Sequence, residues 1–530
     1  MTNLVTEVRS TAEEHADHDA LWSDGTSISY AELFDEIGRF AAALEDAGVG
    51  VDDRVAIYLP NVPQFVTAFH GTLAVGGVVV PMNPQYRSRE IGHLLADSGA
   101  RVVVTIDALA PVVSSVLDET ALEQVVTVAG EAEGVEGYAS FLAAEPTGVV
   151  DRSPDDMAVQ PYTSGTTGTP KGVMLTHHNL RSNTEMVAEL VPDGIRTDDR
   201  SLGVLPLFHI YGMTVVMNAT LFNGGTFYAV PAWDAHTALE LIEGEQLTMM
   251  HGVPAMYNDI INQPNADTFD LSSLRLSGVG GAGIPLEVAK RFEELYSVTL
   301  YEGYGLTETS PVTHFNSPIQ GRRLGSIGRP VPGIDAMVVD ESFKAVDPVP
   351  EGPLDNEASI DEVTGEIVIN GPNVMKGYFG RPEANETAFT EMDGQTWFHS
   401  GDIGYHDEDG YFYVVDRAKH VIVTGGYNVY PREVEELLFE HAAVADAAVV
   451  GIPDERRGET VKAYVVRTPT VSISESDLQA YCLEQLAAYK HPREIEFVED
   501  LPRTTTGKVQ KFELRRMHTE GHGRPLESVD

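Results

Sequence analysis

Short apolar runs separated by longer amphipathic stretches fill the first 150 residues. Three such runs are Val55–Leu59, Val78–Pro81 and Arg101–Thr105. The intervening stretches Gln64–Ala74 and Arg89–Ala96 repeat their apolar residues at helical spacing. Apolar strands that alternate with helices are typical of a parallel sheet covered on both faces. The pattern therefore predicts an α/β layer over this part of the chain.

The same alternation returns after residue 200. The amphipathic stretches Ala235–Glu243 and Pro285–Leu295 predict helices between four further apolar runs. These predicted strands are Leu202–Leu207, Thr226–Val230, Thr248–Val253 and Leu274–Val279. We therefore expect two similar α/β subdomains, and the sequence shows no short tandem repeat.

The pattern changes twice in the last third of the chain. From Gly325 to Tyr413, short strands with many Gly and Pro turns favour a small β-subdomain. Beyond the strand-like Tyr411–Val415, residues 432–439 and 475–488 predict helices and residues 447–450 and 461–466 predict strands. The predicted fold is α/β, with a large N-terminal domain over residues 1–415 and a small α+β C-terminal domain over residues 420–530.

Composition limits the class of protein. A chain of 530 residues exceeds one ordinary core, and 42% hydrophobic residues is typical of globular proteins. No apolar run has membrane-spanning length, and the N-terminus lacks the basic start and apolar block of a signal peptide. A cytoplasmic protein is therefore expected. Cys482 is the only cysteine, so neither an intrachain disulfide nor a cysteine metal cluster can form.

The net charge is unusual. Asp plus Glu number 81 against 35 Lys plus Arg, which gives −46. Such self-repulsion opposes compaction at ordinary ionic strength, but in molar salt the Debye length falls to about 3 Å. We interpret the charge as adaptation to a salt-rich cytoplasm, as in a halophile. It argues against nucleic acid or an anionic membrane as a partner.

One polar decapeptide carries the first chemical signal. It reads Thr163-Ser164-Gly165-Thr166-Thr167-Gly168-Thr169-Pro170-Lys171-Gly172. Glycines let backbone N–H groups converge, hydroxyls donate hydrogen bonds and the lysine supplies positive charge, which together suit a polyphosphate. The spacing differs from the common P-loop G-x-x-x-x-G-K-[ST]. A polar surface turn is the alternative interpretation.

Four more motifs lie downstream. They are Tyr301-Glu302-Gly303-Tyr304-Gly305-Leu306-Thr307-Glu308-Thr309, Ser400-Gly401-Asp402-Ile403-Gly404-Tyr405, Leu207-Phe208-His209-Ile210-Tyr211-Gly212 and Arg503-Thr504-Thr505-Thr506-Gly507-Lys508-Val509-Gln510-Lys511. We expect the first of these to follow a strand at Ser297–Leu300. Together with the decapeptide 163–172, which resembles a phosphate loop, these motifs resemble those of the adenylate-forming (ANL) superfamily, and of the acyl-CoA synthetases within it. The resemblance extends over nearly the whole chain.

The resemblance implies roles for individual residues. Lys508, Glu308, Thr307, Lys171 and His209 would serve catalysis, and Glu308 would help to hold Mg²⁺. The implied ATP- and AMP-binding positions are Thr163, Ser164, Gly165, Thr166, Thr167, Gly168, Lys171, Gly281, Ala282, Tyr304, Gly305, Thr307, Asp402, Arg417 and Lys508. The implied acyl-binding positions are His209, Val253 and Gly305. Gly425 and Gly426 would lie against CoA, and Lys419 would be the pivot of a hinge at 416–419 about which the small domain is mobile.

The implied substrates are a carboxylic acid, ATP and CoA. A carboxylate is a poor acyl donor, and a mixed anhydride with AMP activates it while charge develops on phosphate oxygens. We expect a ligase that converts a medium- or long-chain fatty acid into acyl-AMP and then acyl-CoA. The alternatives are an aryl-CoA (cinnamate-type) ligase, an acyl-AMP ligase that loads a separate carrier protein, and a noncatalytic adenylate-binding protein. The oligomeric state stays open, with a homodimer as one alternative.

Overall fold

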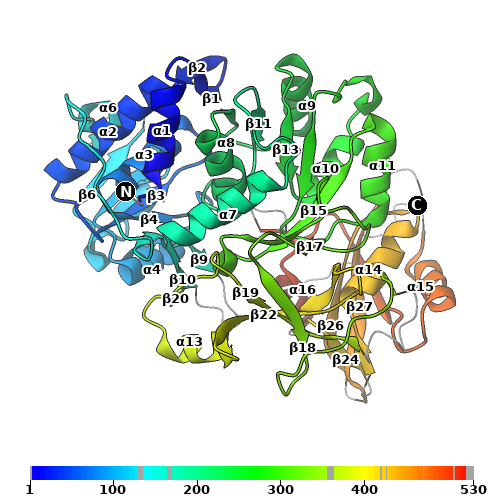
Figure 1. Cartoon of the computed structure of the whole chain (residues 1–530). Coiled ribbons are helices and arrows are strands. Elements are labelled where there is room, and N and C mark those ends of the chain that lie inside the picture. Colours follow the sequence, from blue (N-terminus) through cyan, green and yellow to red (C-terminus); the bar gives the residue numbers. More distant parts are fainter. Residues whose placement is uncertain are drawn as a thin grey trace.

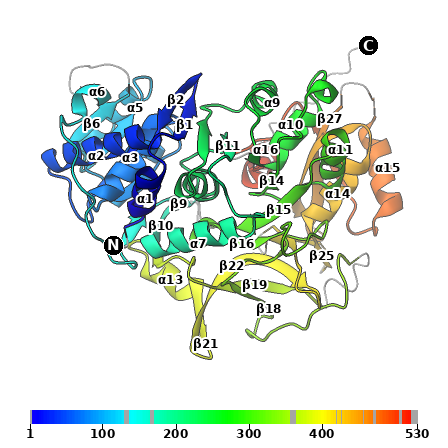
Figure 2. The ribbon, with the colours of Figure 1, turned by 45° about the horizontal axis from the view of Figure 1, so that its top comes forward.

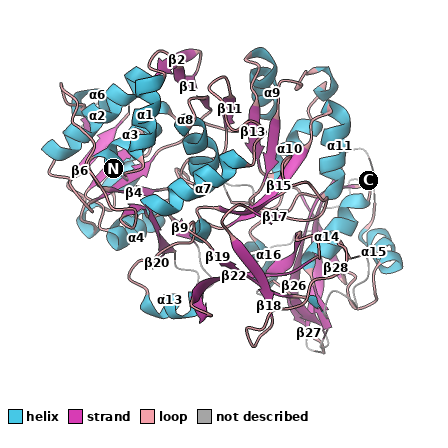
Figure 3. Cartoon of the chain, in the orientation of Figure 1, coloured by secondary structure: helices cyan, strands magenta, loops and turns pink. Residues whose placement is uncertain are grey.

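The computed structural model of the protein describes residues 3–128, 135–163, 170–354, 363–417, 420–424, 427–454, 456–468, 471, 473–504 and 508–520. The predicted site residues Ser164, Gly165, Thr166, Thr167, Gly168, Lys419, Gly425 and Gly426 lie outside the described residues, as does the side chain of Arg417. Helices flank each of the main sheets (Figure 3).

The first sheet has parallel strands in its centre that are buried on both faces. Alternate residues of β3 (Arg54–Tyr58) enter different cores, because successive side chains of a strand point to opposite faces. Val55 and Ile57 pack against α2 (Tyr30–Asp46) and α3 (Pro63–Ala74), while Ala56 and Tyr58 pack against α4 (Ser88–Ser98). The strand order is β20 (Gly377–Tyr378), β10 (Lys171–Thr176), β8 (Met157–Val159), β4 (Val78–Pro81), β3, β5 (Val102–Thr105), β6 (Gln124–Thr127), β7 (Glu136–Gly137).

The second sheet repeats this arrangement. Its order is β17 (Arg329–Pro330), β16 (Val312–Phe315), β15 (Leu300–Gly305), β14 (Leu276–Val279), β13 (Met249–Gly252), β11 (Arg200–Gly203), β12 (Thr226–Ala229), β1 (Asp19–Ser23), β2 (Thr26–Ser29). Helices α9 (Ala235–Gly244), α10 (Pro254–Ile261) and α11 (Leu286–Tyr296) belong to this layer. The two predicted α/β subdomains are thus present (Figure 1).

Two details differ from the sequence expectation. The N-terminal hairpin β1–β2 joins the second sheet, where β1 pairs in parallel with β12, although its residues precede the first sheet. The predicted strand Ser297–Leu300 is also wrong, because α11 runs to Tyr296 and the strand β15 begins at Leu300. The glycines and glutamate of β15 have weak strand propensity, and pairing with β14 and β16 overrides that local preference.

Helix α7 (His177–Glu189) lies between the two layers in both views (Figures 1 and 2). It begins with a capping box between Thr176 and Asn179, which satisfies N–H groups of its first turn. It contacts η2 (Tyr211–Asn218), an eight-residue π-helix. Because π-helical segments are frequent at functional sites, this junction is a candidate position for one.

The β-subdomain and the small domain complete the fold. The β-subdomain is an antiparallel sheet of β18 (Asp335–Val339), β19 (Gly365–Asn370), β21 (Phe389–Met392), β22 (Gln395–His406) and β23 (Phe412–Arg417). Helix α13 (Pro382–Ala388) comes directly before β21 in the chain. The small domain contains β24 (Ile422–Thr424), β25 (Tyr427–Val429), β26 (Val444–Asp454), β27 (Gly458–Arg467), β28 (Glu494–Val498), α14 (Pro431–Glu440), α15 (Glu475–Gln485) and α16 (Lys511–Glu520). The predicted fold class is confirmed.

The small domain has its own core and docks on the large domain. Cys482 of α15 is fully buried in that core, and burial raises the pKa of its thiol to about 12. At the interface, α14 lies beside α11, and the Arg432 guanidinium donates to the carbonyl of Val414 at 3.3 Å. The same guanidinium covers Gly283, where a β-carbon would lie 2.5 Å from it. Within the described part of the chain, no helix combines the length and apolarity needed to cross a membrane.

Candidate functional site

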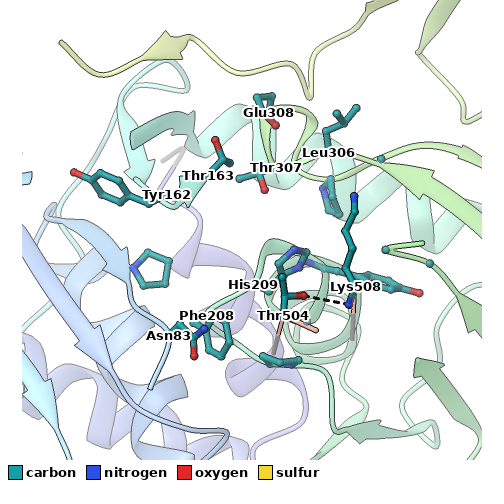
Figure 4. Close-up of a pocket in the computed structure, with 18 of the residues that line it drawn as sticks. Asn83, Tyr162, Thr163, Phe208, His209, Leu306, Thr307, Glu308, Thr504 and Lys508 are labelled. Atoms are coloured by element: carbon teal, nitrogen blue, oxygen red, sulfur yellow. Dashed lines mark hydrogen bonds between the residues drawn. The ribbon is translucent and has the colours of Figure 1, made fainter. Parts of the chain in front are cut away.

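A cavity of about 1420 Å³ opens where the two layers, the β-subdomain and the small domain meet. Thr163, His209, Thr307, Glu308 and Lys508 line it, although they come from distant parts of the sequence (Figure 4). Tyr304 lines the same cavity. Parallel strands of the second sheet end at this cavity, as is usual for ligand sites in α/β proteins.

Lys171, Tyr378 and Glu308 form a short chain of contacts on one wall. Thr163 and Lys171 are partners in the β9 (Tyr162–Thr163) and β10 pair. The Lys171 ammonium lies 5.1 Å from the centre of the Tyr378 ring, within the range of a cation–π contact. The Tyr378 hydroxyl donates to Oε1 of Glu308 at 2.9 Å. Tyr378 therefore links the lysine that is predicted to bind phosphate to the glutamate that is predicted to bind Mg²⁺.

Two buried asparagines hold the loop that carries Thr307 and Glu308. The Asn183 amide of α7 pairs with both backbone groups of Val312, at 2.7 and 3.0 Å. Asn373 Nδ2 donates to the carbonyls of Thr309 and Val312, at 2.6 and 2.9 Å. Both asparagines are fully buried. The loop is therefore fixed before any ligand binds, which suits precise placement of a charge.

The Tyr304 hydroxyl donates to Oδ2 of Asp402 at 2.5 Å. Asp402 is 2% exposed and lies behind the cavity wall, whereas its neighbour Gly401 lines the cavity. A β-carbon at Gly305 would lie 1.9 Å from the Pro311 carbonyl oxygen, so only glycine fits there. Gly281 lines the cavity, while Ala282 is exposed and does not.

Lys508 reaches the cavity from the small domain and approaches His209. Its backbone N–H donates to Thr504 Oγ1 at 3.1 Å, and the Thr504 N–H donates back to the Lys508 carbonyl at 2.8 Å. The lysine side chain extends past His209 toward Leu306 (Figure 4). Burial and the charge of Lys508 lower the pKa of His209 to about 4, so its imidazole is neutral at pH 7. This proximity suits a role in positioning more than proton transfer.

The charge of the lining differs from that of the whole chain. Four basic residues (Arg89, Lys171, Arg503 and Lys508) face three acidic ones (Glu90, Glu308 and Glu366) among the described lining residues. In the whole chain, acids outnumber bases 81 to 35. The cavity is therefore locally suited to a polyanion.

The residues present also fit a phosphate-bound Mg²⁺. A hard cation that keeps phosphate and water ligands needs only one or two carboxylates. Glu308 supplies one beside the Thr163 and Thr307 hydroxyls (Figure 4). No group of three or more His, Cys, Asp or Glu side chains suited to a metal occurs among the described residues, so a metal held entirely by protein side chains is not indicated there.

Part of the cavity wall is apolar, and we call this part the apolar chamber. Five apolar side chains line it: Val187 of α7, Val191 just beyond that helix, Val215 of η2, Leu276 of β14 and Phe315 of β16. Val253, predicted to contact the acyl group, is 4% exposed and lines the same cavity. The chamber is therefore suited to an apolar part of a ligand, while Lys171 and Lys508 line the polar part of the same cavity.

The structure thus brings together most of the predicted site residues that it describes. Sequence reasoning missed Tyr378, Asn183 and Asn373, which orient Glu308 and its loop. Each is a single polar residue far from the motif that it supports, so no spacing pattern marks it. The assigned roles of the predicted residues in binding ATP, acid and CoA stay predictions.

The chain is similar in sequence to known proteins over most of its length. A family model described as AMP-binding enzyme matches residues 8–379, and one described as AMP-binding enzyme C-terminal domain matches residues 433–508. The long-chain-fatty-acid–CoA ligase of Bacillus subtilis (strain 168) is 37% identical over 96% of this chain and 94% of that protein. The feruloyl-CoA synthase of an Amycolatopsis species is 40% identical over 93% of this chain and 94% of that protein.

A solved structure resembles the whole chain as well. ATP-bound MatB from Rhodopseudomonas palustris superposes with a TM-score of 0.86 at 31% identity, covering 98% of this chain and 99% of MatB. The match therefore covers both domains.

Proposed function

Because this chain belongs to the AMP-binding enzyme family and is an AMP-forming acid–CoA ligase, we propose that its acid is a medium- or long-chain fatty acid. The observation that carries the proposal is the apolar chamber formed by Val187, Val191, Val215, Leu276 and Phe315. Burial of an alkyl chain there is favourable by about 0.8 kcal/mol per methylene. His209 and Lys508 line the same cavity, and the carboxylate of a bound acid would face Lys508.

The proposed reaction has two steps. A carboxylate oxygen attacks the α-phosphorus of ATP, an acyl–phosphate bond forms, and the bond to pyrophosphate breaks. The thiol of CoA then attacks the acyl carbon, loses its proton, and releases AMP. Lys508 and Lys171 stabilise the phosphate charge that develops in the first step.

Glu308 and the hydroxyls of Thr163 and Thr307 would hold Mg²⁺ on the phosphates. When bound, the metal neutralises charge on the leaving pyrophosphate. The Tyr378 hydroxyl donates to Glu308 and so orients that carboxylate. Glu308→Gln removes the charge and keeps the shape of the side chain.

An aryl acid is the second candidate. Gly280, Gly281 and Gly303 give part of the cavity a wall without side chains, which suits a flat ring. The relative that is 40% identical carries the name feruloyl-CoA synthase. A panel of acids decides between the two candidates.

The test is AMP release with purified protein, ATP, Mg²⁺ and CoA in molar KCl, across saturated acids of increasing length and a cinnamate series. We expect the highest kcat/KM with acids of medium or long chain. A maximum among aryl acids would favour the second candidate, and release with none of the acids would contradict both. Replacing CoA with a phosphopantetheinylated carrier protein tests the carrier alternative. Glu308→Gln should lose about 10²-fold or more of pyrophosphate exchange, whereas normal exchange at low Mg²⁺ would contradict its metal role.

A further inference from the structure

The connection between β14 and α11 contacts both the cavity and the small domain. It comprises residues 280–285. Gly280 and Gly281 line the cavity. Gly283 lies against Arg432 of α14, the small-domain helix that contacts α11 (Figures 1 and 2). A change in the docking of the small domain would therefore act directly on a segment that forms part of the cavity wall.

The Arg432 guanidinium occupies the place that a side chain at Gly283 would take. A β-carbon at Gly283 would lie 2.5, 2.6 and 2.7 Å from the guanidinium carbon and its two terminal nitrogens, and these are the nearest atoms. The guanidinium Nη1 donates to the Val414 carbonyl of the large domain at 3.3 Å, and Nε lies 3.7 Å from Glu436 Oε1. Arg432 therefore joins the small domain to two separate segments of the large domain.

The small domain also supplies a hydrogen-bond acceptor at the start of α11. Pro285 at the N-cap position makes no side-chain hydrogen bond to this helix. Glu436 of α14 instead accepts from the Leu286 N–H in the first turn, where N–H groups have no partner within the helix. From the large domain, Glu302 accepts from the Ile284 N–H at 3.4 Å. Withdrawal of α14 would leave the first turn of α11 without the acceptor that Glu436 provides.

Helix α14 is connected to Lys508 through the core of the small domain. Val434 and Leu438 of α14 pack on β26 in that core. Asp446, near the start of β26, forms an ion pair with Arg503. Arg503 belongs to the same motif as Lys508, and both line the cavity. The docking of α14 on the connection therefore determines where Lys508 lies in the cavity.

We propose that Arg432 and Glu436 are positioning residues for acyl-AMP formation, which hold Lys508 in the cavity and fix the backbone of Gly280 and Gly281 beside it. This inference rests on the proposed function, because it assumes that Lys508 stabilises phosphate charge in the first step. Interfaces between domains of one chain are commonly polar and permit relative motion, and both side chains can be hydrated when the domains separate. The attack of the thiol gains nothing from Lys508, so the second step does not need this contact.

The test measures the two half-reactions separately, with the acid that gives the highest kcat/KM in the panel above. Pyrophosphate exchange at saturating ATP and acid reports acyl-AMP formation, and thioester formation from supplied acyl-AMP and CoA reports the second step. Arg432→Ala and Glu436→Ala should each lower exchange by about tenfold, the value of one hydrogen bond to a charged group. Thioester formation should stay near the wild-type rate. Arg467→Ala is a matched control, because this exposed arginine lies 4.6 Å from the Phe497 ring within the small domain.

Gly283→Ala tests the same contact from the large domain. The added methyl group displaces the Arg432 guanidinium, so exchange should fall about as far as in Arg432→Ala. The double variant should be no worse than the more affected single variant, because both substitutions remove one shared contact. Gly244→Ala is the control, since a β-carbon at Gly244 would have no neighbour within 4 Å.

Three outcomes would overturn the inference alone. They are unchanged exchange in Arg432→Ala, equal loss of both half-reactions in Arg432→Ala and Glu436→Ala, and additive losses in the double variant. Absence of exchange in wild type with every acid would overturn the proposed function, and this inference with it.

Discussion

Lys508 is the single residue that ties the small domain to the chemistry of the cavity. It lies near the neutral His209 and extends toward the loop of Thr307. A cation in that position helps while negative charge grows on the α-phosphate. It has no such use once a thiol must reach the acyl carbon.

Lys508→Ala should therefore separate the two half-reactions. We expect acyl-AMP formation, measured by pyrophosphate exchange, to fall by about 10²–10³-fold, the usual cost of one preorganised charge or donor. Thioester formation from supplied acyl-AMP should persist. Lys511→Ala is a matched control, because Lys511 pairs with Glu435 at 2.8 Å and does not line the cavity. Equal loss of both steps in Lys508→Ala would contradict the role.

At the level of elements, the contact between α11 and α14 holds the two domains in this arrangement. Arg432 of α14 covers Gly283, and Glu436 of the same helix accepts from the Leu286 N–H at the start of α11. Glu302 of β15 lies beneath them and accepts from the Ile284 N–H at 3.4 Å. Burial raises the pKa of Glu302 to about 7, against the opposing effect of Arg432.

This burial predicts a pH-dependent stability. In the unfolded chain a glutamate titrates near about 4.3, so above about pH 7 the folded protein carries a buried charge that the unfolded chain holds in water. The contribution of Glu302 to stability therefore rises as the pH falls from about 7 to about 4.3, by on the order of 4 kcal/mol. Glu302→Gln should melt higher than wild type at pH 8.5, and this advantage should shrink toward pH 5.

Melting temperatures of wild type and variant across that pH range check the prediction. The exposed Glu341 offers a matched control, because Glu341→Gln should follow the wild-type curve. A difference between wild type and Glu302→Gln that stays constant with pH would mean that Glu302 is ionised in the folded protein throughout the range.

The elements also show what the sequence could and could not predict. The Val-rich run Val78–Pro81 is a strand with those bounds, because a central strand buried on both faces needs continuous apolar residues. Strand β15 was missed, since Tyr301-Glu302-Gly303 carries no such pattern and only its partners make it a strand. The placement of β1–β2 beside β12 could not be predicted from the sequence either, because it depends on a pairing between residues about 200 positions apart.

The same reasoning applies to the site. Glu308 and Lys508 stand in motifs whose residue types and spacing express their chemistry, so the sequence identifies them. Tyr378 and Arg432 act through contacts made only in the folded chain, and each stands in an unremarkable local sequence. Predicting them requires knowledge of which elements are neighbours.

Across the whole molecule, the scarce cations are distributed among the many acids. Arg101 pairs with Asp53 and Glu123, and Lys462 lies 2.7 and 3.6 Å from two glutamates. Even so, 46 acids remain in excess of the Lys and Arg residues. The folded state concentrates this charge, and dissolved salt is what screens it.

Thermal stability should therefore climb steeply between about 0.1 M and 1 M KCl, as the Debye length falls from about 10 to about 3 Å. The measurement is the melting temperature over that range of KCl. Equal osmolality of sucrose is the control, because it stabilises by exclusion from the surface without screening charge. A melting temperature that is flat in KCl, or that rises equally in sucrose, would contradict adaptation to salt.

The buried Cys482 has a practical consequence for following the domains in solution. A thiol with a pKa near 12 is almost wholly protonated at pH 7, and thiols react with maleimide dyes as thiolates. The wild-type chain is therefore an almost unreactive background for labelling, and Cys482 does not need to be replaced. Cysteines introduced at the exposed Val51 of the large domain and Leu483 of the small domain would carry a donor and an acceptor dye. Energy transfer between them would report, molecule by molecule, whether the domain interface described here opens as acyl-AMP is converted to thioester.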